Sequence, residues 1–216
     1  MFVGHYSVAF ATKKADASIP LWVLFLAVQW LDVIWAPLVL LGIERVRIVP
    51  GFTATNPLDL YYMPYTHSLV AAVLWSVAAA LVYGAVRPAS TKSRLFVGLA
   101  VFSHWILDFI VHVPDLPLYD NRAKVGLGLW NKPTVAFCLE AVLLLGAIAI
   151  YLRTVKRSRL GVVAFGLVML GIHAYIFFGP PLASPTAAAL TALGAYAVFA
   201  FAIWFLSDRT VTRHAA

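Results

Sequence analysis

Six long apolar runs constrain what this 216-residue chain can fold into. They cover about residues 18–42, 64–86, 95–113, 134–152, 160–179 and 185–207. Each run is close to the roughly 20 residues that an α-helix needs to cross a bilayer. A lipid-exposed segment must satisfy its backbone polar groups internally, so these runs predict an all-α, integral membrane bundle of about six transmembrane helices.

The composition agrees with this assignment. Hydrophobic residues make up 62% of the chain, charged residues make up 12%, and the mean hydropathy is +0.89. These values lie outside the usual range of soluble proteins. Short loops join the runs, so we expect residues 1–216 to form a single transmembrane helical domain. The apolar segment 1–12 is too short to span, and it predicts a short N-terminal helix that is interfacial or re-entrant.

The net charge of +7 reflects membrane topology rather than nucleic-acid binding. Basic residues sit at helix ends, and no basic groove with interleaved aromatic residues is evident, so we expect no nucleic-acid partner. The positive-inside rule favours placing both termini in the cytoplasm. The cytoplasmic side then receives Lys13, Lys14, Arg87, Lys92, Arg94, Arg153, Lys156, Arg157, Arg159, Arg209 and Arg213, and the outside receives Arg45, Arg47, Arg122, Lys124 and Lys132.

Two external loops carry recognisable features. In the first, about 43–63, Asn56 precedes Pro57, a pair that suits a helix N-cap and first turn, so we expect a short interfacial helix there. The second, 114–133, contains three prolines together with Tyr119 and Trp130. Its composition predicts an ordered surface loop with aromatic anchors at the headgroup level, where substrate contacts would be sought.

The stretch SHWILDFIVHVPD places polar residues inside the third run. His104, Asp108 and His112 follow one another at intervals of four residues, so on an α-helix they form one stripe. An Asp at the centre of a membrane helix costs roughly 2.5–3.5 kcal/mol on the insertion scale, so this stripe should face protein or water.

Other ionisable residues lie at a similar depth. A rise of about 1.5 Å per residue places Asp32 about 21 Å, Asp108 about 20 Å and Glu140 about 20 Å from the cytoplasmic ends of their helices. His67 lies near the external end of its helix. We therefore expect these residues to converge in the outer half of the bundle. The same count from Lys13 places His5 at only about 12 Å, short of this level.

Each of these residues also has a structural interpretation. Asp32 could be an interhelical hydrogen-bonding group, and His67 could be an interfacial residue. His112 could cap the external end of its helix, and Glu140 could pair with Arg122 or Lys132 of the preceding loop.

Together, the residues predict a metal site. Imidazole nitrogen and carboxylate oxygen are ligands that zinc, manganese or iron accepts, and a catalytic site keeps one position open for water. Cys138 is the single cysteine, which excludes a thiolate cluster. We expect one or two divalent ions, zinc first, bound by Asp32, His67, His104 and Asp108, and Asp108 could bridge two ions. Glu140 or His112 would act as general base or orient a ligand.

Several short motifs resemble those of the small multi-spanning bacterial proteins grouped as membrane-bound metal-dependent hydrolases. The resemblance covers roughly residues 1–140 and rests on GHYSVAF, QWLD, YTHS and SHWILDFIVHVPDLPLY. That family is distantly similar to zinc-dependent phospholipases C, helical enzymes with scattered His and Asp ligands. The resemblance implies a location in the bacterial cytoplasmic membrane and the metal ligands His5, Asp32, His67, His104 and Asp108.

Three functions follow as hypotheses. The first is a metal-dependent hydrolase that acts on a phosphoester or ester of a lipid or envelope molecule at the external side, with membrane lipids as its surroundings. The second is a non-enzymatic scaffold or regulatory protein with a structural metal. The third is a proton or metal transporter that uses the same residues as a relay.

Overall fold

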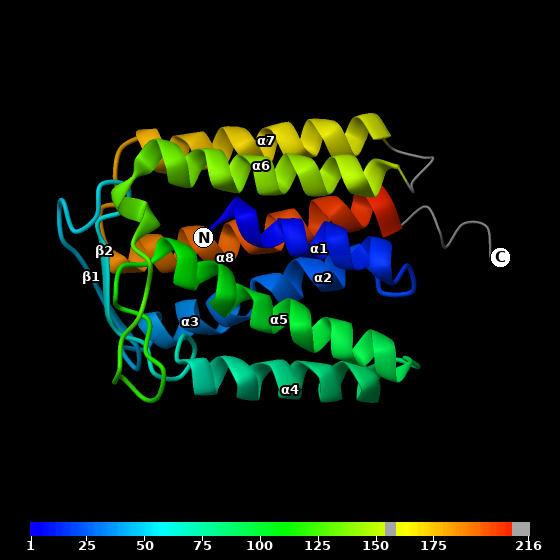
Figure 1. The fold of residues 1–216 in the computed structure, drawn as a ribbon, viewed down its shortest axis with the longest axis horizontal. Helices are drawn as coiled ribbons and strands as arrows, with labels where there is room; N and C mark the ends of the chain where they lie inside the picture. Colours follow the sequence, from blue (N-terminus) through cyan, green and yellow to red (C-terminus); the bar gives the residue numbers. More distant parts are fainter. Residues whose placement is uncertain (154–158, 209–216) are drawn as a thin grey trace.

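The computed structural model describes residues 1–153 and 159–208 as a helical bundle (Figure 1). Four basic residues used in the topology argument, Lys156, Arg157, Arg209 and Arg213, lie outside these ranges. The described helices are α1 (Val3–Ala15), α2 (Leu21–Val28), α3 (Trp30–Leu40), α4 (Leu69–Val86), α5 (Thr91–Val111), α6 (Pro133–Leu152), α7 (Arg159–Phe178) and α8 (Pro185–Ile203), with a 3-10 turn at Leu129–Asn131 and a π-helical turn at Trp204–Asp208.

The predicted spans correspond to helices long and apolar enough to cross a membrane. Five helices of the described residues, α4 to α8, meet this condition singly, and the pair α2 and α3 provides a sixth span if it is counted as one. The structure therefore agrees with an all-α integral membrane protein. It differs at the first span, which is bent by 52° between α2 and α3 instead of being continuous.

The bend centres on Gln29, the buried residue between α2 and α3. Its backbone leaves the helical region, with φ at −109° and ψ at 8°. The Gln29 side-chain amide donates a hydrogen bond to the carbonyl of Phe2 at 3.3 Å. Because the second half of the span restarts after Gln29, Asp32 lies in the first turn of α3 rather than in mid-helix.

Helix α1 enters the interior of the bundle, as the re-entrant alternative expected, and does not lie on its surface. It packs against α6, α2 and α5, and its first residues lie in the middle of the bundle (Figure 1). Val3, Tyr6 and Phe10 are at most 1% exposed. The helix runs from the centre of the bundle to a turn at Asp16, where α2 returns in the opposite direction.

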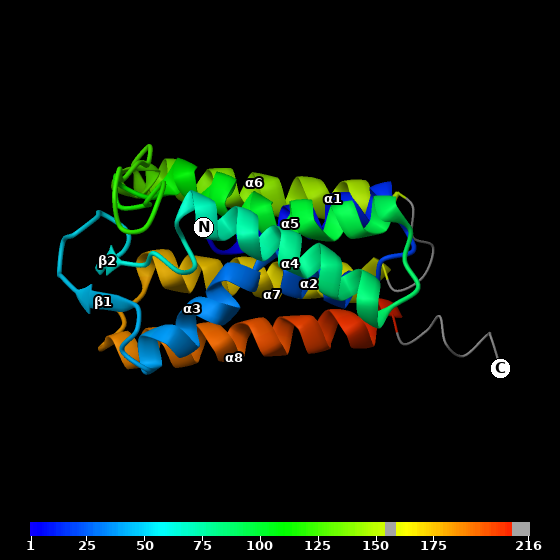
Figure 2. The ribbon, with the colours of Figure 1, turned by 90° about the horizontal axis from the view of Figure 1, so that it is seen from below.

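A β-hairpin covers one end of the bundle. Strands β1 (Arg45–Ile48) and β2 (Leu58–Tyr62) pair antiparallel with one irregularity in register. Figure 2 shows the hairpin and the loop before α6 at the same end, which we call the hairpin end, opposite the α1–α2 turn. The interfacial helix expected after Asn56 is wrong. The Asn56 side chain instead accepts from the Leu58 amide at 2.9 Å, which closes a turn leading into β2.

The loop 114–133 is ordered, as predicted, by two isolated bridges that pair Leu116 with Val125 and Tyr119 with Arg122. Tyr119 is exposed and can reach the headgroup region. Trp130, by contrast, is buried against the ring of His112, with the ring centroids 4.3 Å apart. This tryptophan therefore covers the end of α5 instead of anchoring the surface.

Candidate metal centre

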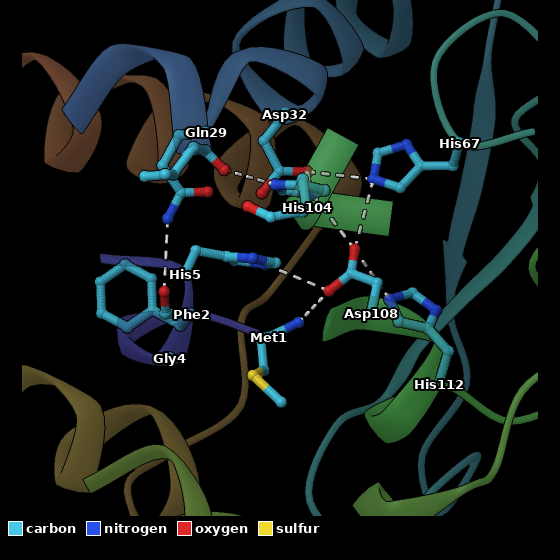
Figure 3. Close-up of polar contacts among 12 residues, drawn as sticks. Met1, Phe2, Gly4, His5, Gln29, Asp32, His67, His104, Asp108 and His112 are labelled. Carbon is cyan, nitrogen blue, oxygen red and sulfur yellow. Dashed lines mark hydrogen bonds and ion pairs between the residues drawn. The ribbon is translucent and has the colours of Figure 1, made fainter. Parts of the chain in front are cut away.

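Asp108 on α5 lies at the centre of a group of histidine rings, as the close-up shows (Figure 3). Its Oδ2 atom is 3.1 Å from His104 Nε2, 3.6 Å from His112 Nε2 and 3.8 Å from His67 Nε2. Its Oδ1 atom is 3.2 Å from His5 Nε2. The four-residue spacing on α5 thus presents His104, Asp108 and His112 to one point, as the sequence predicted.

Asp32 provides a second carboxylate on the opposite side of the same rings. Its Oδ1 atom is 3.2 Å from His67 Nε2 and 3.6 Å from His104 Nε2. Its Oδ2 atom accepts a hydrogen bond from the Tyr196 hydroxyl of α8 at 2.6 Å. The Asp32 side chain is 18% exposed, whereas those of His67, His104 and Asp108 are at most 4% exposed. Asp32 is therefore the most exposed member of the cluster.

The second ring nitrogen of each α5 histidine fixes its tautomer. His104 Nδ1 lies 2.8 Å from the carbonyl oxygen of Val28, and His112 Nδ1 lies 2.9 Å from the Asp115 carboxylate. Both partners only accept, so both Nδ1 atoms must carry the proton. The Nε2 lone pairs of both rings then face Asp108 and are free to bind a metal.

His67 is oriented from the hairpin end. Its Nδ1 atom is 2.7 Å from the Thr66 hydroxyl, and that hydroxyl donates to Glu44 Oε2 at 2.6 Å. Burial raises the pKa of the Glu44 carboxyl, and the nearby His67 ring together with donors from Thr66 and Tyr65 opposes the rise. Glu44 is thus a buried carboxylate that accepts three hydrogen bonds.

The donor set fits a metal ion. His104 Nε2 and both ring nitrogens of His5 are buried without a hydrogen-bond partner. A neutral imidazole lone pair that faces a carboxylate oxygen is unfavourable unless a cation lies between them. The nitrogen–oxygen distances of 3.1–3.8 Å are also near the roughly 3.3 Å that separates two ligands of a tetrahedral ion with bonds of about 2.0–2.1 Å.

Two overlapping ligand groups exist within the described residues. One contains His5, His104 and Asp108, and the other contains Asp32, His67 and His104, each with ligand atoms within 4.8 Å of one another. The amino group of Met1 also donates to Asp108 Oδ1, on the side that faces His5. A cation at the group with His5 would compete with this amine for Asp108 Oδ1, whereas the Tyr196 hydroxyl engages Oδ2 of Asp32 and leaves Oδ1 to the rings of His67 and His104.

His5 lies closer to the cluster than the depth count predicted, because α1 penetrates the bundle. The ring of His5 stacks on that of His104, in contact with Asp108. Helix α1 begins in the middle of the bundle rather than at its surface, so its first turns lie beside α5.

Glu140 serves the start of α1 rather than the histidine rings. It is fully buried on α6, and its Oε2 atom accepts from the amides of Phe2 at 2.8 Å and Gly4 at 3.1 Å. Within the described residues, these amides take the place of the pairing with Arg122 or Lys132 that the sequence allowed. A carboxylate at the N-terminus of a helix satisfies free N–H groups and complements the helix dipole.

Sequence reasoning did not single out three residues that complete this arrangement, namely Glu44, Thr66 and Tyr196. Glu44 and Thr66 lie in loop sequence that offers no periodic signal, and they are 22 residues apart from each other. Tyr196 is one of several aromatic residues in an apolar helix, so only its contact with Asp32 distinguishes it.

Comparisons of the chain with protein-family models, with curated proteins and with solved structures found no match. The function is therefore inferred from the geometry of this cluster.

Proposed function

We propose that the protein is a metal-dependent hydrolase of the membrane that acts on a phosphoester or ester of a lipid or envelope molecule. The observation that carries the proposal is that the Nε2 atoms of His5 and His104 are buried without hydrogen-bond partners while they face the carboxylates of Asp108 and Asp32. Asp32, His67, His104 and Asp108 would hold one ion, and His5 would contribute on the opposite side of Asp108. Zinc suits this set of nitrogen and oxygen ligands, with manganese and iron as alternatives.

A bound divalent ion would lower the pKa of a water molecule and polarise a phosphoryl or carbonyl oxygen. His112 is placed to take up a proton, because Asp115 holds its Nδ1 proton and leaves Nε2 unprotonated near Asp108. Trp130 covers the ring and limits its movement. Of the two predicted general bases, His112 fits the role better than Glu140, whose Oε2 atom is engaged by the start of α1.

The surroundings of Asp32 favour a lipid-like substrate. Asp32 is the partly exposed member of the cluster, and the residues that follow it on α3 are apolar. Val33 and Ile34 are half-buried, while Pro37 and Leu40 are exposed. A substrate that reaches Asp32 along α3 must therefore pass apolar side chains at membrane depth. The Tyr196 hydroxyl beside Asp32 can donate to a substrate oxygen after it leaves the carboxylate.

The second candidate is a structural metal in a non-enzymatic protein, and the burial of the cluster favours it. Structural sites are closed, whereas catalytic sites keep one position open. Only Asp32 gives the cluster an exposed side chain of more than 4%. The transporter alternative is less well supported, because the rings of Phe10, Phe25 and Phe165 pack on one another and place apolar rather than ionisable side chains between α1, α2 and α7.

Asp108→Asn separates these functions, because it keeps the size of the side chain and removes the charge. We would measure bound metal by elemental analysis after purification with zinc or manganese, thermal unfolding with and without chelator, and hydrolysis of short-chain phosphoester and ester lipids. The wild type should carry metal, unfold at a lower temperature in chelator and show metal-dependent hydrolysis. A ligand at 100 times its Kd stabilises by about 2.7 kcal/mol, and Asp108→Asn should lose this gain.

Two results would decide against the hydrolase. A wild type that carries no metal and unfolds at the same temperature in chelator contradicts any metal function. A wild type that binds and is stabilised by metal, yet hydrolyses no lipid in the panel, supports the structural metal instead.

A further inference from the structure

The proposed chemistry makes no direct use of Glu44, although this carboxylate is only 1% exposed. It lies between α3 and β1 at the hairpin end. Its Oε1 atom accepts from the amides of Tyr65 at 2.8 Å and Thr66 at 3.0 Å, and its Oε2 atom accepts from the Thr66 hydroxyl at 2.6 Å. A buried carboxylate with this many donors has a specific task, because its desolvation is costly.

The role of Glu44 follows from the position of the Thr66 hydroxyl proton. A threonine hydroxyl has a single proton, and this proton is donated to Glu44. The hydroxyl oxygen can then only accept from His67 Nδ1, at 2.7 Å. The ring of His67 must therefore carry its proton on Nδ1, which leaves the Nε2 lone pair facing Asp32 at 3.2 Å and Asp108 at 3.8 Å.

His67 differs from the α5 histidines in needing this arrangement. The partners of His104 and His112 are a carbonyl and an ionised carboxylate, which only accept. A hydroxyl can donate as well as accept, so Thr66 alone would leave the tautomer of His67 open. In the tautomer with the proton on Nε2, His67 could not bind a metal through that atom.

The backbone fixes the position of His67 independently. Its amide donates to the Met63 carbonyl at 3.3 Å, and its carbonyl accepts from the Trp105 indole at 2.9 Å. Ser68 next to it caps α4 by accepting from the Ala71 amide. Changes at Glu44 or Thr66 can therefore alter the proton position while the ring stays in place.

We propose that Glu44, acting through the Thr66 hydroxyl, is a positioning residue that selects the metal-binding tautomer of His67. The inference rests on the proposed function insofar as a metal is what the tautomer serves. The tautomer itself is observable without metal.

Glu44→Gln tests the relay directly. The amide oxygen of the new side chain can still accept from the two backbone amides, while its NH₂ group donates to the Thr66 oxygen. The hydroxyl proton must then turn to His67 Nδ1, which reverses the tautomer. Thr66→Val removes the relay without changing Glu44, Thr66→Ser keeps it, and Thr53→Val serves as a control. Thr53 is also buried in the hairpin loop but bonds only to Asn56.

The measurement is nitrogen-15 NMR of the histidine rings in chelator, with the His67 signals assigned from His67→Asn, followed by zinc titration. The wild type, Thr66→Ser and Thr53→Val should show the proton on Nδ1 of His67. Glu44→Gln should show it on Nε2, and Thr66→Val should show a mixture. Zinc affinity should fall by about 10–100-fold in Glu44→Gln and Thr66→Val, as is typical when a ligand loses its orienting partner, and should stay close to that of the wild type in Thr66→Ser.

The outcomes separate the relay from the metal function. An unchanged His67 tautomer in Glu44→Gln and Thr66→Val overturns the relay, even if the wild type binds zinc. A reversed tautomer in Glu44→Gln supports the relay, even if the wild type binds no zinc and the hydrolase proposal fails. Should Glu44→Gln not fold, the comparison of Thr66→Val with Thr66→Ser decides in the same way.

Discussion

The imidazole rings of His5 and His104 stack with centroids 3.9 Å apart and planes at 4°. The rings come from α1 and α5, and their Nε2 atoms approach the two different oxygens of Asp108 at 3.2 Å and 3.1 Å. The Asp108 carboxylate therefore lies between a ring of its own helix and a ring of α1. This relationship makes the position of α1 part of the candidate metal centre.

His5→Phe tests whether α1 contributes a ligand. Phenylalanine keeps a flat ring that can stack on His104, and it removes two buried ring nitrogens, of which only Nε2 approaches a polar atom, Asp108 Oδ1 at 3.2 Å. Loss of a partner that orients a metal ligand typically lowers metal affinity by about 10–100-fold. Because His5→Phe removes a ligand itself, we expect zinc affinity, measured by titration, to fall by at least as much. Thermal unfolding in chelator should change little.

His173→Phe is the matched control. His173 is equally buried but stacks on Phe137, and its nearest carboxylate oxygen, in Glu140, is 4.0 Å away. Its replacement should leave zinc affinity unchanged. If His5→Phe binds zinc as well as His173→Phe does, the ion lies in the group of Asp32, His67 and His104 without help from α1.

The sequence predicted those parts of the site that local periodicity determines. The spacing of His104, Asp108 and His112 requires only that their segment be helical, and α5 is helical over this stretch up to His112, which is its C-cap. The depth count brought Asp32 and Asp108 to nearly the same level, and the structure places His104 Nε2 3.6 Å from Asp32 and 3.1 Å from Asp108. Depth along a helix is set by the rise per residue, which varies little.

The other parts depend on partners that are distant in the sequence. The N-terminal segment could lie in the interface or enter the bundle, and Glu140, 136 residues beyond Gly4, satisfies its amides inside. The break at Gln29 likewise involves Phe2, 27 residues away. Hydrophobic periodicity reports burial but does not identify which residue satisfies a buried polar group.

The turn between α1 and α2 predicts a pH dependence of stability. The Ser18 hydroxyl donates to Asp16 Oδ1 at 2.6 Å, and the Ser93 hydroxyl of α5 donates to Oδ2 at 2.7 Å. These hydrogen bonds lower the pKa of the Asp16 carboxyl. A lowered pKa in the folded state stabilises the protein above the ordinary carboxyl pKa, and this stabilisation is lost as the pH falls through the folded value.

Ser93→Ala should therefore destabilise the protein by about 1 kcal/mol near neutral pH, a moderate value because Asp16 is partly exposed. The difference from the wild type should shrink in acid, as followed by thermal unfolding between about pH 7 and pH 3. Ser103→Ala on the same helix is the control, because its hydroxyl donates to the Ala100 carbonyl and not to a carboxylate. A loss in Ser93→Ala that does not vary with pH would show that the Ser93 hydrogen bond to Asp16 contributes no charge-dependent stability.

The positive-inside argument predicts that the hairpin end faces the outside of the cell. The exposed Cys138 is first replaced by serine, and single cysteines are then introduced as Arg122→Cys in the hairpin-end loop and Lys14→Cys near the α1–α2 turn. An impermeant maleimide should label Arg122→Cys on intact cells and Lys14→Cys only after permeabilisation. The reverse pattern would place the candidate metal centre near the cytoplasmic face and overturn the predicted topology.

Glu140 allows the positioning and catalytic roles to be separated by two substitutions. Glu140→Ala leaves the amides of Phe2 and Gly4 without their acceptor inside the bundle, which costs about 1–3 kcal/mol for each buried group left unpaired. Helix α1 should then loosen, and zinc affinity should fall together with stability, because α1 carries His5. Glu140→Gln retains an amide oxygen that can accept from both groups, so most of the stability and the zinc affinity should be preserved.

If Glu140 only positions α1, Glu140→Gln should also retain most of any metal-dependent hydrolysis. A Glu140→Gln protein that binds zinc normally but has lost hydrolysis would instead identify Glu140 as the general base, since an amide cannot take up the proton of a water molecule. If His112→Asn, like Glu140→Gln, binds zinc but has lost hydrolysis, both residues act on the same proton.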